Sequence, residues 1–349
     1  MQKKILSLTL VAFLIVSFFN STIINAEVND TSGGDIQSND EVVTATNMED
    51  LPLDLLEDIE VSEYDDTGDS IVTEEEDYSA EIDFESNSID FTDVNGNNIE
   101  VSVEDEDLEF KENNDGSIVF ENKEENYQVE NQILDGGFRQ LYTLESEVSP
   151  KEIKIDIDLE NGQYLKEEDG LYYIKNENGE TIYNIGKPWA VDSKGNFIDT
   201  HYTLKDNAIY QNINYTGNSY PVKADPLFCS DTINNTSTKW NSSYDGGKGT
   251  FSVYTRTCTK AYITANWALG IGTLGAISQA SIMGDMWSEV TADADFKKHI
   301  SSSKRGRIKD QFICHAANPL TIYKSSWNLE PWRPDKSLSA TYAKACNPK

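Results

Sequence analysis

This fold is constrained most by short segments in which apolar and polar residues alternate strictly. The clearest run is 153–159, and 80–84 and 99–103 repeat the pattern. Successive side chains of a strand point to opposite faces, so this alternation indicates strands with one buried face. Dipeptides typical of turns separate the segments, at 95–96, 115–116, 161–162, 178–179 and 194–195. Because Asn-Gly and Asp-Gly supply the positive φ angles of tight hairpins, residues 80–226 are predicted to form an antiparallel β-sandwich or meander.

The charge of the chain is distributed very unevenly. Its 349 residues carry a formal net charge of −33, with 61 Asp and Glu against 28 Lys and Arg. Residues 27–110 hold 30 acidic residues and no Lys or Arg, whereas residues 230–349 hold 9 acidic and 15 basic residues. The full chain is therefore not expected to bind nucleic acid, because phosphate would be repelled.

Residues 27–79 are acidic and poor in aromatic residues. Such a stretch cannot bury enough apolar surface to offset the entropy lost on ordering. We therefore predict a disordered acidic segment there, with 51–56 as a short helix or docking segment within it.

Residues 1–26 have the three parts of an export signal. Lys3 and Lys4 precede an uncharged apolar stretch, 5–19, and a polar end that closes in Ile-Asn-Ala. We expect cleavage after Ala26 and a secreted, extracellular protein, with cell-wall association as a further option. An uncleaved membrane anchor is the alternative, but the apolar stretch is shorter than the ~20 residues of a spanning helix.

All four cysteines lie in the last third of the chain, at Cys229, Cys258, Cys314 and Cys346. An even number of cysteines in an exported chain favours disulfides, and four cysteines allow three pairings. We favour Cys229–Cys258 with Cys314–Cys346, because neighbouring pairs close the shortest loops and cost least chain entropy. Zinc is the alternative, but the chain has no Cys-x-x-Cys, and we expect neither a metal nor a cofactor.

Residues 227–349 change character again and contain five of the six tryptophans. Residues 261–284 carry no charge, and within them small residues recur at every fourth position, at Ala268, Gly272, Ala276, Ala280 and Gly284. This spacing places small side chains on one helix face. We predict a small disulfide-bonded α/β domain with a buried small-residue helix, membrane insertion being the alternative. The expected whole is a multi-domain α+β protein, divided as 1–26, 27–79, 80–226 and 227–349.

Two stretches resemble known sequences. The blocks Asp310-Gln-Phe-Ile-Cys-His315 and Trp327-Asn-Leu-Glu-Pro-Trp-Arg-Pro334, with the ending Cys346-Asn-Pro348, resemble a C-terminal domain family of secreted bacterial proteins. That family is of unknown function, so the resemblance implies export and supports the Cys314–Cys346 pair, but it brings no activity. More loosely, the segment that ends Tyr220-Pro-Val-Lys-Ala-Asp-Pro226 is similar to β-rich presentation segments that precede effector domains.

Among the three histidines, His315 is the candidate for catalysis, because histidine is the usual general acid or base near neutral pH. If 308–315 is helical, Gln311 lies one turn back and can orient it. Glu330 could reach it from the Trp-rich loop. The alternative is a structural, hydrogen-bonded His315.

A binding platform is the second candidate site. Trp327, Trp332, Arg333 and Asp335 lie close together in the sequence, and adjacent Trp and Arg side chains suit stacking and cation–π contacts with a ligand. The same residues equally suit a core lid, because a small domain needs large apolar side chains.

The function that these features favour is an effector or binding module at the C-terminus. It would act on an anionic cell-envelope polymer or a membrane surface, and the acidic regions would mask it within the chain. The alternatives are an extracellular hydrolase centred on His315 and a non-catalytic envelope or adhesion protein.

Overall fold

The computed structural model describes residues 24–25, 41–42 and 62–348, apart from 64, 104, 106, 113–117, 161, 169, 231–235, 269–282, 285, 318–320 and 345. Its contacts divide the chain into two compact units. One is a β-sandwich that contains residues 52–235 and 255–269, and the other contains 236–254 and 270–349 together with 1–51. Most of the predicted export signal and most of residues 27–79 lie outside the described residues. The described residues before residue 62 form two two-residue strands, β1 (Ile24–Asn25) and β2 (Glu41–Val42), which pair.

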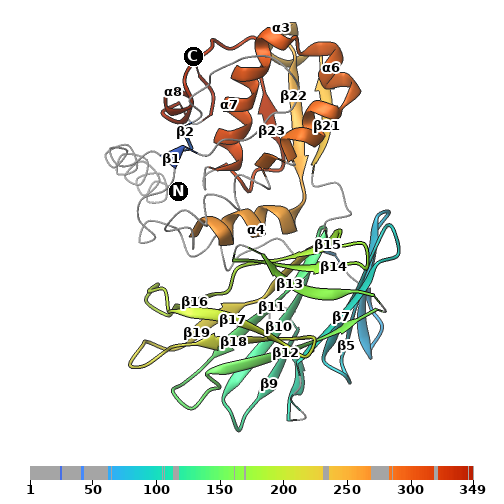
Figure 1. Ribbon diagram of the computed structural model, residues 1–349, viewed down its shortest axis with the longest axis vertical. Coiled ribbons are helices and arrows are strands. Elements are labelled where there is room, and N and C mark those ends of the chain that lie inside the picture. The colour runs from blue at the N-terminus through green and yellow to red at the C-terminus, as the bar shows by residue number, and fades with distance from the viewer. Residues whose placement is uncertain are drawn as a thin grey trace. The chain divides into compact units, whose positions relative to one another are not determined.

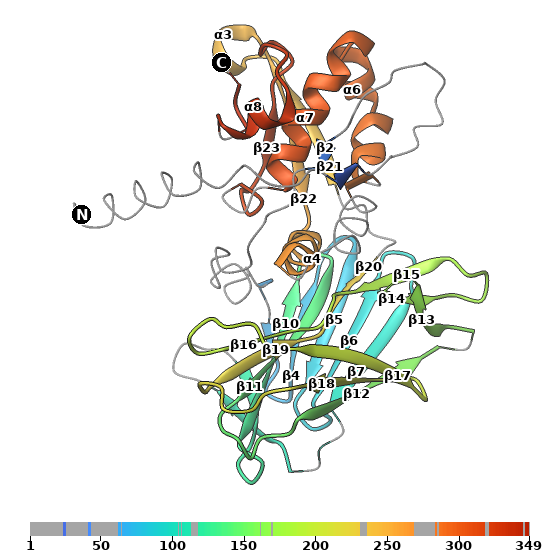
Figure 2. The same ribbon diagram turned by 60° about the vertical axis from the view of Figure 1, so that its left-hand side comes forward.

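The sandwich is built from two antiparallel sheets (Figures 1 and 2). The first has the order β17-β18-β12-β7-β6-β5-β4-β3. Its strands are β3 (Asp65–Asp66), β4 (Ser70–Glu74), β5 (Tyr78–Asp83), β6 (Ser88–Asp93), β7 (Asn98–Val103), β12 (Glu152–Leu159), β17 (Thr200–Lys205) and β18 (Ala208–Ile213). The three alternating segments of the sequence form β5, β7 and β12, so the period-two prediction is confirmed.

The second sheet has the order β13-β14-β15-β20-β11-β10-β9-β8, and β19 pairs with both β11 and β16. Its strands are β8 (Glu109–Glu112), β9 (Ile118–Asn122), β10 (Tyr127–Leu134), β11 (Gly137–Leu144), β13 (Tyr164–Glu168), β14 (Leu171–Lys175), β15 (Thr181–Ile185), β16 (Trp189–Asp192), β19 (Val222–Asp225) and β20 (Leu227–Ser230). Gly96, Gly162, Gly179 and Gly195 all adopt positive φ at the expected turns, while 115–116 lies outside the described residues.

The inward faces of both sheets share one apolar core. Phe91 of β6 contacts Phe138 of β11 and the ring of Tyr183 of β15, at centroid distances of 5.9 and 6.3 Å. The Tyr183 hydroxyl donates to the backbone carbonyls of Phe91 and Asn97 in the opposite sheet. The polar end of the buried Tyr183 thus finds partners across the core.

The structure moves two of the expected boundaries. β3, β4 and the first residues of β5 lie inside the stretch 27–79 that was expected to be disordered. Apolar and polar residues alternate only weakly in 70–74. These residues form a strand because they pair with residues 79–83 of β5. The boundary expected at 226/227 also differs, because β20 lies between β11 and β15 in the middle of the second sheet.

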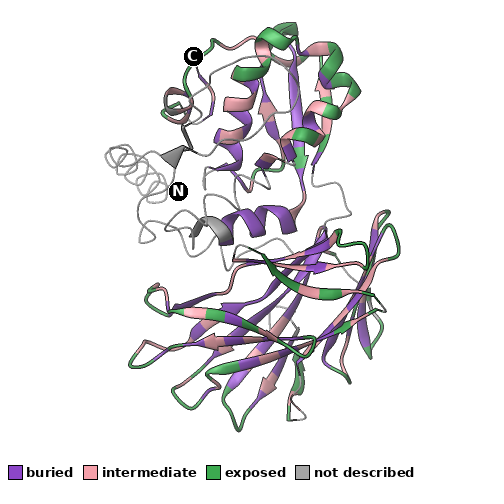
Figure 3. Cartoon of the chain, in the orientation of Figure 1, coloured by how far each residue is buried: buried purple, intermediate pink, exposed green. Residues whose placement is uncertain are grey.

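Helix α4 (Thr257–Ala268) also belongs to the sandwich unit. Cys258 forms a disulfide with Cys229 of β20, and the Cα atoms are 5.6 Å apart. Just before the helix, Arg256 pairs with Asp135 at 2.6 Å and with Asp77. Residues 258–265 are all buried, as the purple ribbon in Figure 3 shows. Burial on every side favours uncharged residues, which fits 261–265, although the helix also buries Lys260.

The small-residue ladder falls mostly on 269–282, outside the described residues. At Gly284 no atom lies within 4 Å of the position that a Cβ would take. Within the described part of the chain, no helix has the length and apolarity needed to cross a membrane.

The C-terminal unit combines a three-stranded sheet, ordered β21-β22-β23, with short helices. The elements are β21 (Thr236–Asn241), α3 (Tyr244–Gly247), β22 (Thr250–Thr255), α6 (Ala294–His299), the 3₁₀ turn η2 (Ser302–Lys304), α7 (Arg305–Ala316), β23 (Trp327–Leu329) and α8 (Leu338–Tyr342). Phe251, Phe296 and Phe312 form its aromatic core with Trp287 and Trp327. Cys314 of α7 forms a disulfide with Cys346, so both predicted pairs are confirmed.

Candidate functional site

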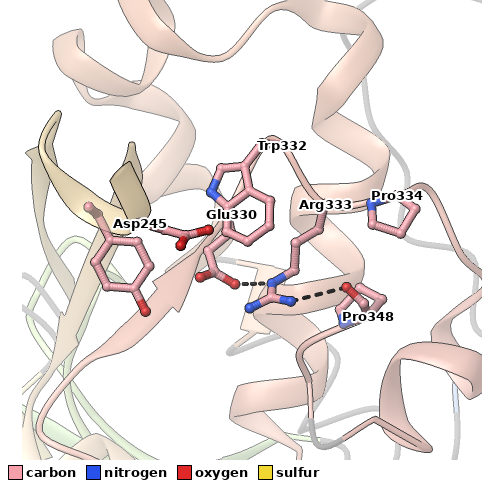
Figure 4. A pocket seen from close by; sticks show the side chains of 7 residues that line it. Asp245, Glu330, Trp332, Arg333, Pro334 and Pro348 are labelled. Carbon is pink, nitrogen blue, oxygen red and sulfur yellow. Dashed lines mark hydrogen bonds and ion pairs between the residues drawn. The ribbon is translucent and has the colours of Figure 1, made fainter. Parts of the chain in front are cut away.

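A pocket of about 660 Å³ opens in the C-terminal unit, where α3 lies beside the chain that follows β23 (Figure 4). We call it the Trp332 pocket. Its lining residues are Tyr244, Asp245, Glu330, Trp332, Arg333, Pro334 and Pro348. Three of these, Glu330, Trp332 and Arg333, were singled out from the sequence, so the structure brings part of each predicted site into one cavity.

A buried ion pair forms the polar part of the pocket. Glu330 is only 1% exposed, and Arg333 Nε donates to its Oε2. Arg333 Nη1 also donates to the carbonyl of Pro348 at 3.2 Å, and Figure 4 shows the guanidinium bridging these two acceptors. A buried charge is tolerated when it is paired and hydrogen-bonded in this way. The pair therefore fixes the C-terminal end of the chain against the pocket.

The hydroxyl of Tyr244 joins this pair. Burial raises the pKa of Tyr244, and the carboxylate of Glu330, to which the hydroxyl is hydrogen-bonded, raises it further. Ionisation of the phenol beside that carboxylate is thus disfavoured, so Tyr244 is a neutral hydrogen-bonding group at physiological pH.

Gln311 positions Glu330 rather than His315. Glu330 N donates to Gln311 Oε1 at 2.9 Å, and Gln311 Nε2 donates to the Glu330 carbonyl at 3.3 Å. This two-sided amide contact holds the backbone of Glu330 against α7. The role expected for Gln311, orienting His315, is not what the geometry shows.

The rim of the pocket is a tight glycine-rich loop, residues 245–249. Asp245, Gly246 and Gly247 all have positive φ, and Gly249 N donates to the Tyr244 carbonyl at 3.2 Å. Trp332 Nε1 donates to the Gly249 carbonyl at 3.1 Å. A Cβ at position 249 would overlap the ring of Trp240, so glycine is required there. The loop is therefore held in one conformation.

Two cations flank the indole of Trp332. Lys248 Nζ lies 4.4 Å from the ring centroid, and the Arg333 guanidinium lies 4.7 Å from it. Lys248 also pairs with Asp245 at 2.9 Å. The lining residues alone carry one net negative charge, and the neighbouring Lys248, which pairs with Asp245, balances it.

His315 lies apart from this pocket. It is 3% exposed on α7, and its ring stacks on Trp327 with centroids 6.4 Å apart. Among the described residues, neither ring nitrogen meets a partner in hydrogen-bonding geometry. Burial lowers the pKa of His315 to about 3; the nearby Lys324 lowers it too, and the Asn328 backbone offsets part of the shift. A neutral, enclosed ring of this kind is placed for packing rather than for proton transfer to a substrate.

The remaining predicted residues divide between core and surface. Trp327 is fully buried, and its Nε1 donates to the carbonyls of Thr321 and Ile322. Asp335 is exposed and lies 3.6 Å from Arg307. Neither residue lines the pocket.

Sequence reasoning missed four lining residues as site residues, namely Tyr244, Asp245, Pro334 and Pro348. The segment Gly246-Gly-Lys-Gly-Thr250 lacks the spacing of a phosphate-binding loop. The signal that could have identified this loop is its several glycines beside an Asp, a composition that is typical of a backbone with positive φ.

Metal ligation finds no support in the described parts of either unit. No group of three or more His, Cys, Asp or Glu side chains there is arranged to hold a metal ion.

The comparisons with known proteins concern the C-terminal part of the chain. A search of curated proteins finds no match. Residues 236–349 match the model of a family described as a protein of unknown function, DUF2599. The matched range includes α4, which the structure assigns to the sandwich unit. The C-terminal part of this chain is therefore similar to a family of unknown function, in the region where the sequence motifs resemble one.

Proposed function

We propose that the protein is exported and that its C-terminal unit binds an anionic polymer of a cell envelope. The observation that carries the proposal is a continuous basic segment, residues 297–309, which spans the end of α6, η2 and the first turns of α7. It holds six Lys and Arg residues and no Asp or Glu. Lys297, Lys298 and Arg305 are exposed.

Helix stability accounts for only two of these charges, because Lys297 and Lys298 lie in the last turn of α6, where the helix dipole favours cations. Lys304 is the N-cap of α7 and makes no side-chain cap, and Arg305 and Arg307 follow in the first turn. The helix dipole disfavours cations at this end. An anionic partner would relieve both the mutual repulsion and the unfavourable dipole, which supports a binding role for the segment.

Export rests on two features. The two disulfides indicate an oxidising environment. The first 26 residues have the pattern of a cleaved signal. We expect Glu27 at the N-terminus of the protein in culture medium, measured by intact mass. Secreted material that still retains residues 1–26 would contradict the cleavage.

Binding should be tested with the mature chain, residues 27–349. A variant in which Lys297, Lys298, Lys304 and Arg305 become Gln should lose binding to polyphosphate, measured by calorimetry. The matched control converts to Gln four lysines that are exposed on the sandwich, namely Lys151, Lys166, Lys194 and Lys205. Both variants change the net charge equally. Equal loss of binding in the control would show that only overall charge matters.

The acidic residues that precede β3, the first strand of the sandwich, would compete with the polymer. Residues 27–61 contain eleven Asp and Glu and no Lys or Arg. A chain beginning at residue 62 should bind polyphosphate more tightly at low salt, and the gain should shrink as salt screens the charges. Unchanged affinity would remove the masking hypothesis while leaving the binding surface intact.

A further inference from the structure

We propose that the Trp332 pocket binds an uncharged sugar ring, so that the C-terminal unit holds a glycan site separate from the basic segment 297–309. The inference goes beyond the proposed function, because it would stand even if no anionic polymer were bound.

The size and lining of the pocket suit one or two such rings. Its volume of about 660 Å³ lies within the range of small-molecule sites, roughly 300–1,000 Å³. Tyr244, Pro334 and Pro348 supply rigid apolar surface. Small-molecule sites typically combine such surface with a few fixed polar groups.

The charges of the pocket disfavour ionic ligands. A cation would meet an indole whose ring already carries Lys248 and Arg333. An anion would meet Asp245 and Glu330, and the guanidinium of Arg333 is already bonded to Glu330 and to the Pro348 carbonyl. An uncharged ligand pays neither penalty.

The polar groups match hydroxyls. The exposed Asp245 carboxylate accepts hydrogen bonds, and the Tyr244 hydroxyl, which donates its proton to Glu330, can accept one. Sugar hydroxyls are donors, so they can satisfy both groups.

The pocket is also formed before any ligand arrives. Gln311 fixes the backbone of Glu330, and the indole N–H of Trp332 fixes the carbonyl of Gly249. Asp245 is held in a left-handed conformation that non-glycine residues seldom adopt. Pre-organisation of this kind lowers the entropy lost on binding.

The experiment titrates the mature chain with chito-, cello- and malto-oligosaccharides by calorimetry at low and high salt. We expect at least one series to bind with an affinity that salt does not change. Asp245→Asn should weaken that binding about tenfold, as expected for a lost hydrogen bond to a charged group, and Tyr244→Phe should weaken it several-fold. The shift of the Trp332 indole N–H signal, assigned by its loss in Trp332→Phe, should report the same titration.

Matched controls separate the pocket from general effects. Asp206 also has positive φ, is exposed and pairs with a neighbouring lysine, Lys205, so Asp206→Asn repeats the chemistry on the sandwich. Tyr164→Phe removes an exposed hydroxyl there. Both should leave saccharide binding unchanged.

Three outcomes would overturn the proposal. They are the absence of binding in every uncharged series, equal binding by wild type and both pocket variants at unchanged melting temperature, and displacement of the saccharide by inorganic phosphate. None of them bears on polyphosphate binding by the basic segment, so the failure of one proposal is distinguishable from the failure of the other.

Discussion

At the scale of single residues, His315 shows how burial decides a role that residue type leaves open. The sequence offered it as a general acid or base, but the folded chain encloses it against Trp327. Its folded pKa of about 3 lies below the unfolded value of 6.5. The unfolded state therefore binds the proton first, and stability falls as pH drops from about 6.5 towards 3.

We predict that His315→Phe removes this acid sensitivity. The full shift corresponds to roughly 5 kcal/mol, which the wild type loses across that window and the variant keeps. Near pH 7 the variant should be as stable as the wild type, because an aromatic ring replaces one whose nitrogens meet no partner. Urea unfolding of the C-terminal unit at several pH values measures both the stability near pH 7 and its loss at acidic pH. Parallel pH profiles for the two proteins would contradict the account.

Gly137 is the second residue whose role depends on its neighbours. A Cβ there would overlap the Phe228 carbonyl and lie 2.6 Å from Cys258 Sγ. Gly137→Ala should destabilise the sandwich by about 1–3 kcal/mol, because the disulfide must move. Gly306→Ala is the control, because nothing lies near its added Cβ in α7, and it should stabilise slightly. Urea unfolding that shows no loss for Gly137→Ala would disprove the overlap.

At the scale of elements, α4 is joined to the sandwich although it lies within the sequence of the C-terminal family. The Cys229–Cys258 bridge and the Arg256 ion pairs with Asp77 and Asp135 make this connection. The two disulfides therefore stabilise different units.

We predict distinct effects when each bridge is removed. Replacing Cys229 and Cys258 by Ser should cost about 2–4 kcal/mol and raise amide exchange in β20 and β11. Replacing Cys314 and Cys346 should instead raise exchange in α7 and α8. Hydrogen-exchange mass spectrometry resolves these segments. If removal of either disulfide raised amide exchange equally in both units, the chain would unfold as a single unit.

At the scale of the whole molecule, the chain passes from one unit to the other more than once. Residues 227–235 and 255–269 return to the sandwich, while 236–254 belong to the C-terminal unit. A cut at 226/227 therefore divides the second sheet between its central strands.

We predict that residues 27–226 expressed alone do not fold. Without β20, strands β11 and β15 lose the neighbour that joins them, and Phe228 leaves the core. A chain of residues 27–269 should fold, because it restores β20, α4 and the first disulfide. Circular dichroism and thermal melting compare the two. A cooperative melt of 27–226 would contradict the topology.

Properties that depend on local pattern could be predicted from the order of the amino acids alone. Alternation placed β5, β7 and β12, glycine-containing turns separated them, and loop entropy selected both cysteine pairs. These inferences succeed because the period of a strand and the length of a loop are written in neighbouring residues. The remaining features became apparent only in the folded chain. Folding placed β20 in the middle of a sheet, enclosed His315, and brought Asp245 to Glu330 across 85 positions of sequence. Burial and long-range pairing depend on which distant parts of the chain come into contact, and no local sequence pattern specifies those contacts.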